Sequence, residues 1–457
     1  MNILHNIENI YFVGIGGIGM SALARFAKLK GLAVSGYDKT ETTLTRLLAS
    51  EGIDITYEDT IAEISERVKN ERTTLVVYTP AIPKNNNILN WFISENYNVI
   101  KRSQLLGEVT KNTLCLAVAG THGKTTTSAI LGHLLASCEM PVTAFLGGIA
   151  ENYKSNFISK GTEITVVEAD EFDRSFLTLS PDIACVTSMD ADHLDIYGNA
   201  NAIEEGFKEF AALVEKKENL LHKKGLPLSG QTVAIEEEAA FEAQEVRIEN
   251  GAYVFNLKTP KQTVQDLQFY LPGHHNLHNA VTALGMAILA GSPTDCLPKA
   301  LASFKGVDRR FSYRIRSNDL VLIDDYAHHP TEINALYQAV SEMYPNDKKV
   351  IVFQPHLFSR TKDFAVGFAE SLAQFDEVCL LDIYPAREMP IEGVTSQWLA
   401  DLIREVDDNK TNTLVPTILS KSQIATFLKK SDCRIKLMVG AGDIGAEVQQ
   451  VTKELAK

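Results

Sequence analysis

The sequence predicts an α/β protein made of three successive units with parallel sheets. Short apolar and β-branched runs alternate with helix-like segments along most of the chain, which is the pattern of βαβ units. The length of 457 residues exceeds what one ordinary core supports and suits two or three domains. Polar residues separate the units near 108–112 and 312–318.

The first unit begins with a strand over residues 10–13 and a helix over residues 20–30 that ends at Gly31. Further strands are predicted over residues 33–37 and 75–78, the latter closed by Thr-Pro. These runs are short and rich in β-branched residues, as strands of a parallel sheet are.

The second unit begins with a strand over residues 113–118, which leads into a glycine loop and a helix from about Thr125. Buried strands follow over residues 164–167 and 183–187. Residues 221–272 change character, and their turn residues and short alternating runs predict an antiparallel insert. A helix starting near Asn276 restores the α/β pattern.

The third unit repeats the alternation of strand and helix. Its predicted strands cover residues 320–323, 350–353, 378–381 and 436–439.

Composition and charge argue against several classes of protein. Hydrophobic residues make up 45% and charged residues 22% of the chain, the balance of a soluble globular protein. No run approaches the roughly 20 apolar residues that span a bilayer, and the first residues lack the features of a signal peptide. A net charge of −14 argues against a broad nucleic-acid-binding surface.

The six cysteines are scattered, without a Cys-x-x-Cys pair. We therefore expect reduced, mostly buried thiols, no structural zinc and a cytoplasmic protein. They are Cys115, Cys138, Cys185, Cys296, Cys379 and Cys433.

Two segments, residues 14–19 and 440–445, match Gly-x-Gly-x-x-Gly between a strand and a helix. In such a turn the backbone amides and the helix dipole favour an anion. The first segment has Asp38 at the end of the next strand, which also fits a site for NAD. A tight strand-to-helix turn needs glycine with or without a ligand, so the pattern is weak. We expect a phosphate-bearing ligand at the first turn and a structural role for the second.

The loop Gly120-Thr121-His122-Gly123-Lys124-Thr125 is more specific, because it lies between a clear strand and a clear helix. Lys124 offers a positive charge to the β- and γ-phosphates of ATP, and Thr125 offers a hydroxyl to Mg²⁺. Val118 stands where the full Walker spacing has a glycine, so the loop is a shortened variant.

Acidic residues follow two strands of the second unit. Residues 168–171 are Glu-Ala-Asp-Glu, and residues 190–195 are Asp-Ala-Asp-His-Leu-Asp. Ligands of parallel sheets gather at the carboxyl ends of strands, and a hard cation beside ATP needs oxygen ligands. Glu168 is placed to supply one, and His193 could bind a metal or act as a base.

In the third unit, residues 324–332 form the dense polar segment Asp-Asp-Tyr-Ala-His-His-Pro-Thr-Glu, with Pro330 suited to the first turn of a helix. Arg360 follows the next strand and could bind a carboxylate. Arg310, in Arg-Arg-Phe at the domain boundary, could reach nucleotide phosphates, although a solvated arginine pair explains it as well.

Taken together, these motifs resemble the Mur ligases of peptidoglycan synthesis. The resemblance runs from Tyr-Phe-Val-Gly-Ile-Gly-Gly-Ile-Gly-Met-Ser at 11–21 to Gly-Ala-Gly-Asp-Ile-Gly at 440–445. It includes the loop at 120–127, the acidic strand ends, Arg-Arg-Phe at 309–311, the segment at 324–332, and Pro-Gly-His-His-Asn-Leu-His-Asn at 272–279.

The resemblance implies three domains: an N-terminal Rossmann-like domain over 1–110 that binds a UDP-sugar, a central P-loop-type ATP-binding domain over 111–314 that carries the antiparallel insert, and a C-terminal Rossmann-like domain over 315–457 that brings the amino acid. It also implies the reaction. The lactyl carboxylate of UDP-N-acetylmuramate takes the γ-phosphate of ATP, and the amine of L-alanine attacks the acyl phosphate. ATP and Mg²⁺ are the implied cofactors, and a monomer or weak dimer without nucleic-acid or membrane partners is expected.

The resemblance also assigns roles to residues. The UDP-sugar would be bound by Gly14, Gly16, Gly17, Gly19, Met20, Ser21, Asp38 and Thr79. ATP would be bound by Gly120, Thr121, His122, Gly123, Lys124, Thr125, Thr126, Asn276, Asn279, Arg310 and Asp325. Mg²⁺ would be held by Thr125, Glu168 and His193, and the amino acid would lie among Tyr326, His328 and Arg360. The catalytic set would be Lys124, Glu168, His193, Asp325, His328 and Arg360.

Two positions depart from the family pattern. Ala327 stands where many members carry glycine, and Leu357 where some carry a second arginine. Three alternatives stay open at this point: a recycling ligase that adds a tripeptide to UDP-N-acetylmuramate, an NAD-dependent dehydrogenase, and a non-catalytic nucleotide switch.

Overall fold

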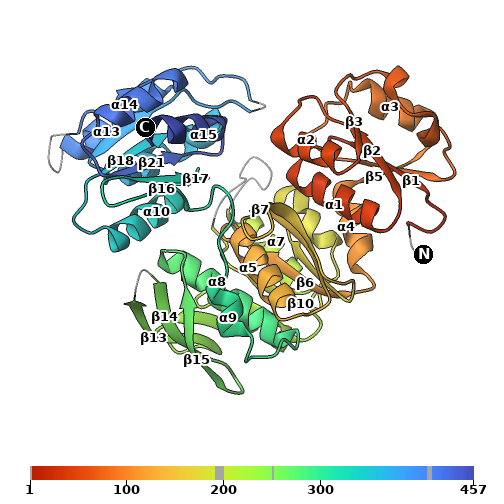
Figure 1. The fold of residues 1–457 in the computed structure, drawn as a ribbon, viewed down its shortest axis with the longest axis horizontal. Helices are drawn as coiled ribbons and strands as arrows, with labels where there is room; N and C mark the ends of the chain where they lie inside the picture. Colours follow the sequence, from red (N-terminus) through yellow and green to blue (C-terminus); the bar gives the residue numbers. More distant parts are fainter. Residues whose placement is uncertain (1–2, 191–199, 250–251, 387, 409–413, 457) are drawn as a thin grey trace. The chain divides into compact units, whose positions relative to one another are not determined.

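The computed structural model describes residues 3–190, 200–249, 252–386, 388–408 and 414–456 (Figure 1). It contains three sheets, one for each unit that the strand–helix alternation predicts. Outside the predicted insert, every strand predicted for the three units coincides with a strand of these sheets.

The first sheet is parallel, with strand order β3-β2-β1-β4-β5. Its strands are β1 Asn9–Val13, β2 Ala33–Tyr37, β3 Asp54–Thr56, β4 Thr74–Tyr78 and β5 Asn98–Lys101. Its helices are α1 Ile18–Leu29, α2 Thr43–Ser50, α3 Asn87–Ser94 and α4 Arg102–Thr110. The strand order reverses between β1 and β4, and this is the point where open α/β sheets bind ligands.

The second sheet has the order β15-β14-β13-β12-β11-β10-β6-β9-β7-β8. Its strands are β6 Leu114–Ala119, β7 Val142–Ala150, β8 Ser155–Ser159, β9 Ile164–Glu168, β10 Ile183–Val186, β11 Leu220–Lys223, β12 Gln231–Ile235, β13 Phe241–Glu249, β14 Ala252–Lys258 and β15 Thr263–Phe269. Its helices are α5 Lys124–Ser137, α7 Ala200–Ala211, α8 His274–Leu289 and α9 Leu297–Ala302. Because β6 pairs in parallel with both β9 and β10, the ends of these three strands lie at one edge.

The prediction of an antiparallel insert was wrong for β11, β12 and β13. These strands extend the central sheet, and both β11–β12 and β12–β13 pair in parallel. A Cβ on Gly230, at the start of β12, would lie 2.4 Å from the carbonyl oxygen of Leu220, at the start of β11. Turn residues specify that the chain bends but not in which direction the next strand runs, so the sequence could not distinguish the two arrangements.

The third sheet has the order β16-β17-β21-β18-β19-β20. Its strands are β16 Ser312–Arg316, β17 Val321–Asp325, β18 Lys349–Phe353, β19 Glu377–Leu380, β20 Thr417–Ile418 and β21 Ile435–Val439. Its helices are α10 Pro330–Met343, α11 Phe358–Asp363, α12 Ala365–Leu372, α13 Ser396–Asp408, α14 Ile424–Lys430 and α15 Ile444–Leu455. Only β16 is antiparallel to its neighbour among the pairs described.

Both faces of the third sheet are buried. Ile351 and Phe353 of β18 join one hydrophobic cluster, whereas Val350 and Val352 join the other. Successive side chains of a strand point to opposite faces, so a strand covered by helices on both sides must be apolar throughout. This explains the uninterrupted apolar runs of the third unit.

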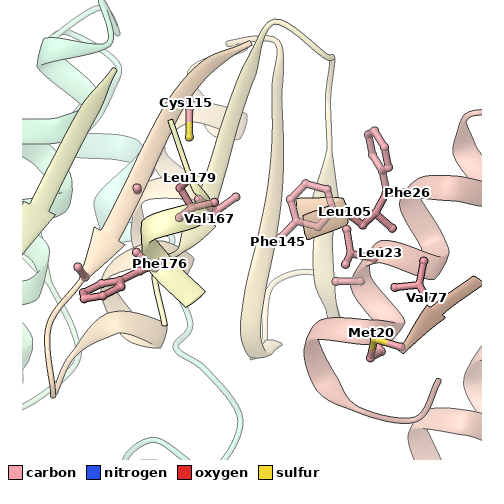
Figure 2. Packing of buried hydrophobic residues seen from close by; sticks show 14 of the residues in the cluster. Met20, Leu23, Phe26, Val77, Leu105, Cys115, Phe145, Val167, Phe176 and Leu179 are labelled. Atoms are coloured by element: carbon pink, nitrogen blue, oxygen red, sulfur yellow. The ribbon is translucent and has the colours of Figure 1, made fainter. Parts of the chain in front are cut away.

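By its contacts the chain divides into two compact units. One comprises 1–247, 254–269 and 278–305, and the other comprises 248–253, 270–277 and 306–457. The first two sheets therefore share one unit. A common hydrophobic cluster joins them, in which the ring of Phe26 on α1 lies 5.5 Å from the ring of Phe145 on β7 (Figure 2).

The expectation of six reduced thiols was wrong for Cys138 and Cys296. They form a disulfide across 158 residues of sequence, with Cα atoms 5.7 Å apart, whereas the other four cysteines are buried thiols. Cys138 ends α5 and Cys296 precedes α9, and only the packing of these two helices brings the sulfurs together. The cysteine pattern therefore no longer argues for a reducing compartment. Within the described residues, no helix has the length and apolar character that a bilayer span requires.

We predict that the unreduced protein, unfolded in denaturant, exposes four reactive thiols, and that reduction raises the number to six. The measurement is a titration with a thiol reagent that absorbs on reaction. Cys296→Ser should add one thiol to the unreduced value, because Cys138 loses its partner. Six thiols before reduction would contradict the disulfide.

Candidate active site

The loop between β6 and α5 needs both of its glycines. Gly120 has a φ of 130° and Gly123 a φ of 85°, which residues with a Cβ rarely adopt. A Cβ on Gly120 would lie 2.1 Å from Oγ1 of Thr187, and one on Gly123 would lie 2.6 Å from Oδ1 of Asn279. The structure thus places the predicted nucleotide residue Asn279 directly against this loop.

The end of the neighbouring strand β10 holds the loop. Thr121 donates its N–H to the Ser188 carbonyl and its hydroxyl to the Asp190 carbonyl, at 3.2 and 2.8 Å. The N–H of His122 donates to the Ser188 hydroxyl at 2.8 Å. Hydrogen bonds within the protein therefore position Thr121 and His122 against this strand end.

Lys124, the first residue of α5, is surrounded by acceptors. Its Nζ lies 2.7 and 2.9 Å from the two carboxylate oxygens of Glu171 and 2.7 Å from the Gly120 carbonyl. Burial alone would lower the pKa of Lys124, but Glu171 and two further carboxylates outweigh it, so the pKa is raised. The side chain is therefore held as an ammonium.

Glu168 lies beside Lys124 at the end of β9. Its carboxylate accepts hydrogen bonds from the hydroxyls of Thr125 and Ser128, at 3.2 and 3.1 Å, and from the N–H of Gly147 at 2.6 Å. Burial raises the pKa of Glu168, whereas the Gly147 N–H and Lys124 oppose that rise. A Cβ on Gly147 would lie 2.4 Å from the Glu168 carboxylate, so this position must be glycine.

Thr125 and Glu168 fit a hard divalent cation, because their oxygens lie 3.2 Å apart and are the ligand type that Mg²⁺ prefers. The third predicted ligand, His193, lies outside the described residues. Among the described residues, no cluster of three or more His, Cys, Asp and Glu side chains forms a metal site by itself. Mg²⁺ usually keeps waters and substrate phosphates as its other ligands.

A cavity of about 190 Å³ connects this loop with the first glycine turn. Its lining includes Gly19, Arg102, Lys124, Glu168 and Asp170. Arg102 reaches Asp170 at 3.4 Å, and its guanidinium covers Gly19, where a Cβ would lie 2.4 Å from Nη1. Two cations and two anions therefore meet at the two turns that the sequence predicts as phosphate sites.

The first glycine turn lies at the reversal of strand order. A Cβ on Gly14 would lie 2.7 Å from Thr79, which follows β4, and the N–H of Gly16 donates to Asp38 at 2.8 Å. Gly17 precedes the first residue of α1. Gly14, Gly16, Asp38 and Thr79 are thus brought together at the carboxyl ends of β1, β2 and β4.

Met20 and Ser21 were predicted to bind the UDP-sugar, but their side chains are buried. Met20 packs in the hydrophobic cluster, and the Ser21 hydroxyl accepts a hydrogen bond from Asn156 at 2.9 Å. The N–H of Ser21 is also bonded within the helix, to Gly17. Both residues therefore pack on a helix face turned toward the core, and their contact with a UDP-sugar stays a prediction.

The second glycine turn is filled by the protein itself. The side chain of Gln354 accepts a hydrogen bond from the N–H of Ile444 and donates one to Asp443, at 2.8 and 2.7 Å. A Cβ on Gly442 would lie 2.4 Å from Gln354, and one on Gly445 would lie 2.4 Å from Arg309. These contacts support the prediction of a structural turn, which stays a prediction.

In the compact unit that contains residues 306–457, the predicted amino-acid residues gather around His328. Its ring lies 5.5 Å from the Tyr326 ring and 6.1 Å from the His356 ring. Arg360 is buried and places Nη1 3.3 Å from Nδ1 of His356. In the turn before Arg360, Leu357 has a φ of 70°, which is unusual for a residue with a side chain. The N–H of Leu357 stabilises this turn by donating to the Tyr384 carbonyl at 2.9 Å.

Asp325 ends β17 and organises the Arg-Arg-Phe turn. Its carboxylate accepts the N–H groups of Phe311 and Ala327, at 2.7 and 2.8 Å, and burial raises its pKa to about 6. Arg310 lies over the Tyr326 ring, 5.1 Å from its centroid. A direct contact of Asp325 or Arg310 with a nucleotide stays a prediction.

Asn276 is buried, and its side-chain amide donates to the Pro272 carbonyl at 2.7 Å. Thr126 is also buried, in the first turn of α5. Neither observation identifies a ligand, so the assignment of Asn276 and Thr126 to the nucleotide stays a prediction.

The structure also places at these sites several residues that were not predicted from the sequence. Glu171 and Glu332 belong to the acidic motif at 168–171 and the polar segment at 324–332, so their position beside the predicted residues is a signal that the sequence contains. Arg102, Ser128 and Gly147 have no sequence signal, because their neighbours are distant along the chain.

Three family models match the chain: "Mur ligase family, catalytic domain" over residues 9–113, "Mur ligase middle domain" over 118–287, and "Mur ligase, glutamate ligase domain" over 309–432. Two curated proteins named UDP-N-acetylmuramate–L-alanine ligase are similar to it. The one from Christiangramia forsetii is 56% identical and covers 100% of this chain and 99% of its own. The one from Flavobacterium psychrophilum is 58% identical and covers 99% of both chains.

Among solved structures, the UDP-N-acetylmuramate-alanine ligase of Thermotoga maritima has a TM-score of 0.81 and 27% identity, covering 98% of this chain and 99% of its own. The fold, the strand-to-helix loop with Lys124, and the carboxylates around it define an ATP-dependent enzyme of the ligase class. The chain belongs to the Mur ligase family.

We predict that Gly147→Ala lowers the maximal rate of ATP consumption by about ten- to a hundredfold, because a new Cβ displaces the Glu168 carboxylate. Ser128→Ala removes only one hydrogen bond to the same carboxylate and should cost less. Steady-state kinetics on variants with wild-type circular dichroism spectra provide the measurement. A folded Gly147→Ala enzyme with an unchanged rate would contradict the role of this contact.

Proposed function

We propose that the protein joins L-alanine to the lactyl carboxylate of UDP-N-acetylmuramate, with ATP converted to ADP and phosphate. The observation that carries the proposal is the cavity where Lys124 and Glu168 meet the first glycine turn and Arg102. The full-length relatives that carry this activity in their names support the choice of substrates.

The chemistry explains why this arrangement is needed. A carboxylate is a poor electrophile, so one of its oxygens first forms a bond to the γ-phosphorus of ATP while the bond to the ADP oxygen breaks. The amine nitrogen then forms a bond to the acyl carbon, and phosphate leaves with the electrons of the broken C–O bond. Both steps collect negative charge, and catalysis consists mainly of positioning and of neutralising that charge.

Lys124 is the central residue of the first step. Its ammonium is kept protonated by the adjacent carboxylates, and its attachment to the Gly120 carbonyl fixes it at the start of α5. The helix N-terminus adds a second, fixed positive potential at the same place. Phosphate groups would replace carboxylate oxygens as partners of this ammonium.

Thr125 and Glu168 would hold Mg²⁺, with His193 as the third proposed ligand. When bound, the ion would neutralise phosphate charge. On the protein's side, Ser128 and the Gly147 N–H keep the Glu168 carboxylate beside Thr125.

Arg102 is proposed to contact an anionic group of the nucleotide sugar. Its guanidinium lies over the N-terminal turn of α1 and is also tied to Asp170. It therefore links the proposed sugar-nucleotide turn with the acidic end of β9. Gly14, Gly16, Gly17, Gly19, Asp38 and Thr79 would complete that site.

In the compact unit that contains residues 306–457, Tyr326, His328 and Arg360 are proposed to bind the amino acid, with Arg360 for its carboxylate. Asn276, Asn279, Arg310 and Asp325 are proposed to contact ATP. We further propose a cytoplasmic location, where both nucleotide substrates are available, and a monomer or weak dimer.

The comparisons do not favour the alternatives. A dehydrogenase would leave Lys124 and its carboxylates without a purpose, and a non-catalytic switch would not need a second substrate site beside them. The tripeptide-adding ligase differs only in the amine it uses, so a direct competition of amines distinguishes it.

The test of the function is phosphate release from ATP with UDP-N-acetylmuramate and either L-alanine or the tripeptide. We expect phosphate release with L-alanine, and at most a background rate with the tripeptide. Lys124→Ala should release no phosphate while it still binds the UDP-sugar. Preference for the tripeptide, or loss of UDP-sugar binding in folded Lys124→Ala protein, would overturn the assignment.

We predict that Arg102→Met raises the KM for the UDP-sugar about tenfold, or more, because one charged contact contributes roughly 1.5–3 kcal/mol. The KM for ATP should change much less. Arg72→Met is the control, since the Arg72 side chain is 88% exposed in the same domain. Equal KM values for Arg102→Met and wild-type enzyme would exclude the contact.

A further inference from the structure

We propose that His328 is the general base that takes a proton from the ammonium group of the incoming amino acid, and that Glu332 is its positioning residue. This inference rests on the proposed function and assigns the proton transfer that the amide-forming step requires. His328, its hydrogen-bond partners and the charged groups near it all lie in the compact unit that contains residues 306–457.

The hydrogen bonds of His328 determine which ring nitrogen carries the proton. Nδ1 lies 2.9 Å from the backbone carbonyl oxygen of Tyr326, and a carbonyl can only accept. Nδ1 must therefore be the donor, and the neutral ring keeps its lone pair on Nε2. The fold thus fixes the tautomer with Nε2 as the basic atom.

Glu332 is built to hold this ring. It lies in the first turn of α10, four residues after His328, and its Oε2 accepts the backbone N–H of His328 at 2.8 Å. The same Oε2 lies 3.3 Å from Nδ1 of the ring, and Oε1 lies 3.7 Å from Nη1 of Arg310. A carboxylate behind a histidine both orients the ring and stabilises the imidazolium that forms when the ring takes a proton.

The charges around His328 keep it ready to accept a proton. Burial lowers the pKa of His328, Arg360 and Arg310 lower it further, and Glu332 and the Tyr326 carbonyl raise it. The net result is a lowered pKa, so the ring is neutral near neutral pH. The aromatic rings of Tyr326 and His356 flank it.

The proposed reaction needs a base at this point. Near neutral pH an amino group is largely protonated and has no lone pair to offer. One proton moves from nitrogen to Nε2 of His328, and the freed electron pair forms the bond to the acyl carbon. Phosphate departs with the electrons of the C–O bond and takes the second proton that the nitrogen loses as the amide forms. His328 shares its surroundings with Arg360, the residue proposed for the carboxylate of the same amino acid.

The test compares two amines that differ in charge. Hydroxylamine is neutral near pH 7 and needs no base before it attacks an acyl phosphate, whereas L-alanine does. We expect His328→Gln to lower the alanine-dependent rate about a hundredfold at neutral pH, the size of a general-base contribution, and to leave hydroxamate formation within about threefold of wild type. His5→Gln is the control, because His5 is exposed.

The pH profile supplies a readout that a purely structural role would not change. In His328→Gln the alanine-dependent kcat should rise tenfold per pH unit as solvent deprotonates the amine, and should approach wild type at high pH. In Glu332→Gln the acid limb of kcat/KM for alanine should move to lower pH, because removing an anion lowers the pKa of His328. The KM for ATP should stay near wild type in His328→Gln.

Two results would overturn the proposal. One is an equal loss of alanine- and hydroxylamine-dependent rates in His328→Gln, and the other is an alanine-dependent rate that keeps the wild-type pH profile. Failure of the proposed function would look different, because wild-type enzyme would then form no hydroxamate from UDP-N-acetylmuramate and ATP.

Discussion

The central site depends on the charge of Lys124. An ammonium buried at the start of α5 is stable only because carboxylates surround it, with Glu171 in direct contact and Asp170 and Glu168 close by. The same set of charges would be costly without that cation, since buried carboxylates repel one another and lack water. The loop and the strand ends therefore stabilise each other. Lys124 forms the centre of the site, and phosphate oxygens could take the place of the carboxylate oxygens that now contact its ammonium.

The parallel pairing of β6 with β9 and β10 creates this arrangement. It brings three strand ends to one edge: the loop after β6, Glu168 at the end of β9, and Ser188 and Asp190 after β10. Glycine is needed wherever these segments approach closely. Gly120 makes room for Thr187, and Gly147 makes room for Glu168. The glycines of this Mur ligase are thus explained by neighbours that come from distant parts of the chain.

The two Gly-x-Gly-x-x-Gly segments show how one sequence pattern serves two purposes. At residues 440–445 the side chains of Gln354 and Arg309 occupy the space that the missing side chains leave, and Gln354 satisfies the helix amide of Ile444. At residues 14–19 the neighbours of the turn include Asp38 and Arg102, and the Arg102 guanidinium lines a cavity. The difference lies in the side chains that reach each turn, which come from other parts of the sequence.

The fold class, the positions of most strands outside the insert, and the loop with Lys124 could be predicted from the sequence. These features follow from local rules, because apolar runs, glycine turns and helix starts involve residues that are close along the chain. The sequence also indicated the polar segments around His328 and Arg360. The parallel direction of β11 and β12, the pairing of Cys138 with Cys296, and the burial of Met20 and Ser21 became clear only from the three-dimensional packing. Likewise, Glu171 was visible as an acidic residue, but its contact with Lys124 across 47 positions was not. Such contacts are set by which strands pair and which helices pack together, and these depend on residues far apart in the sequence.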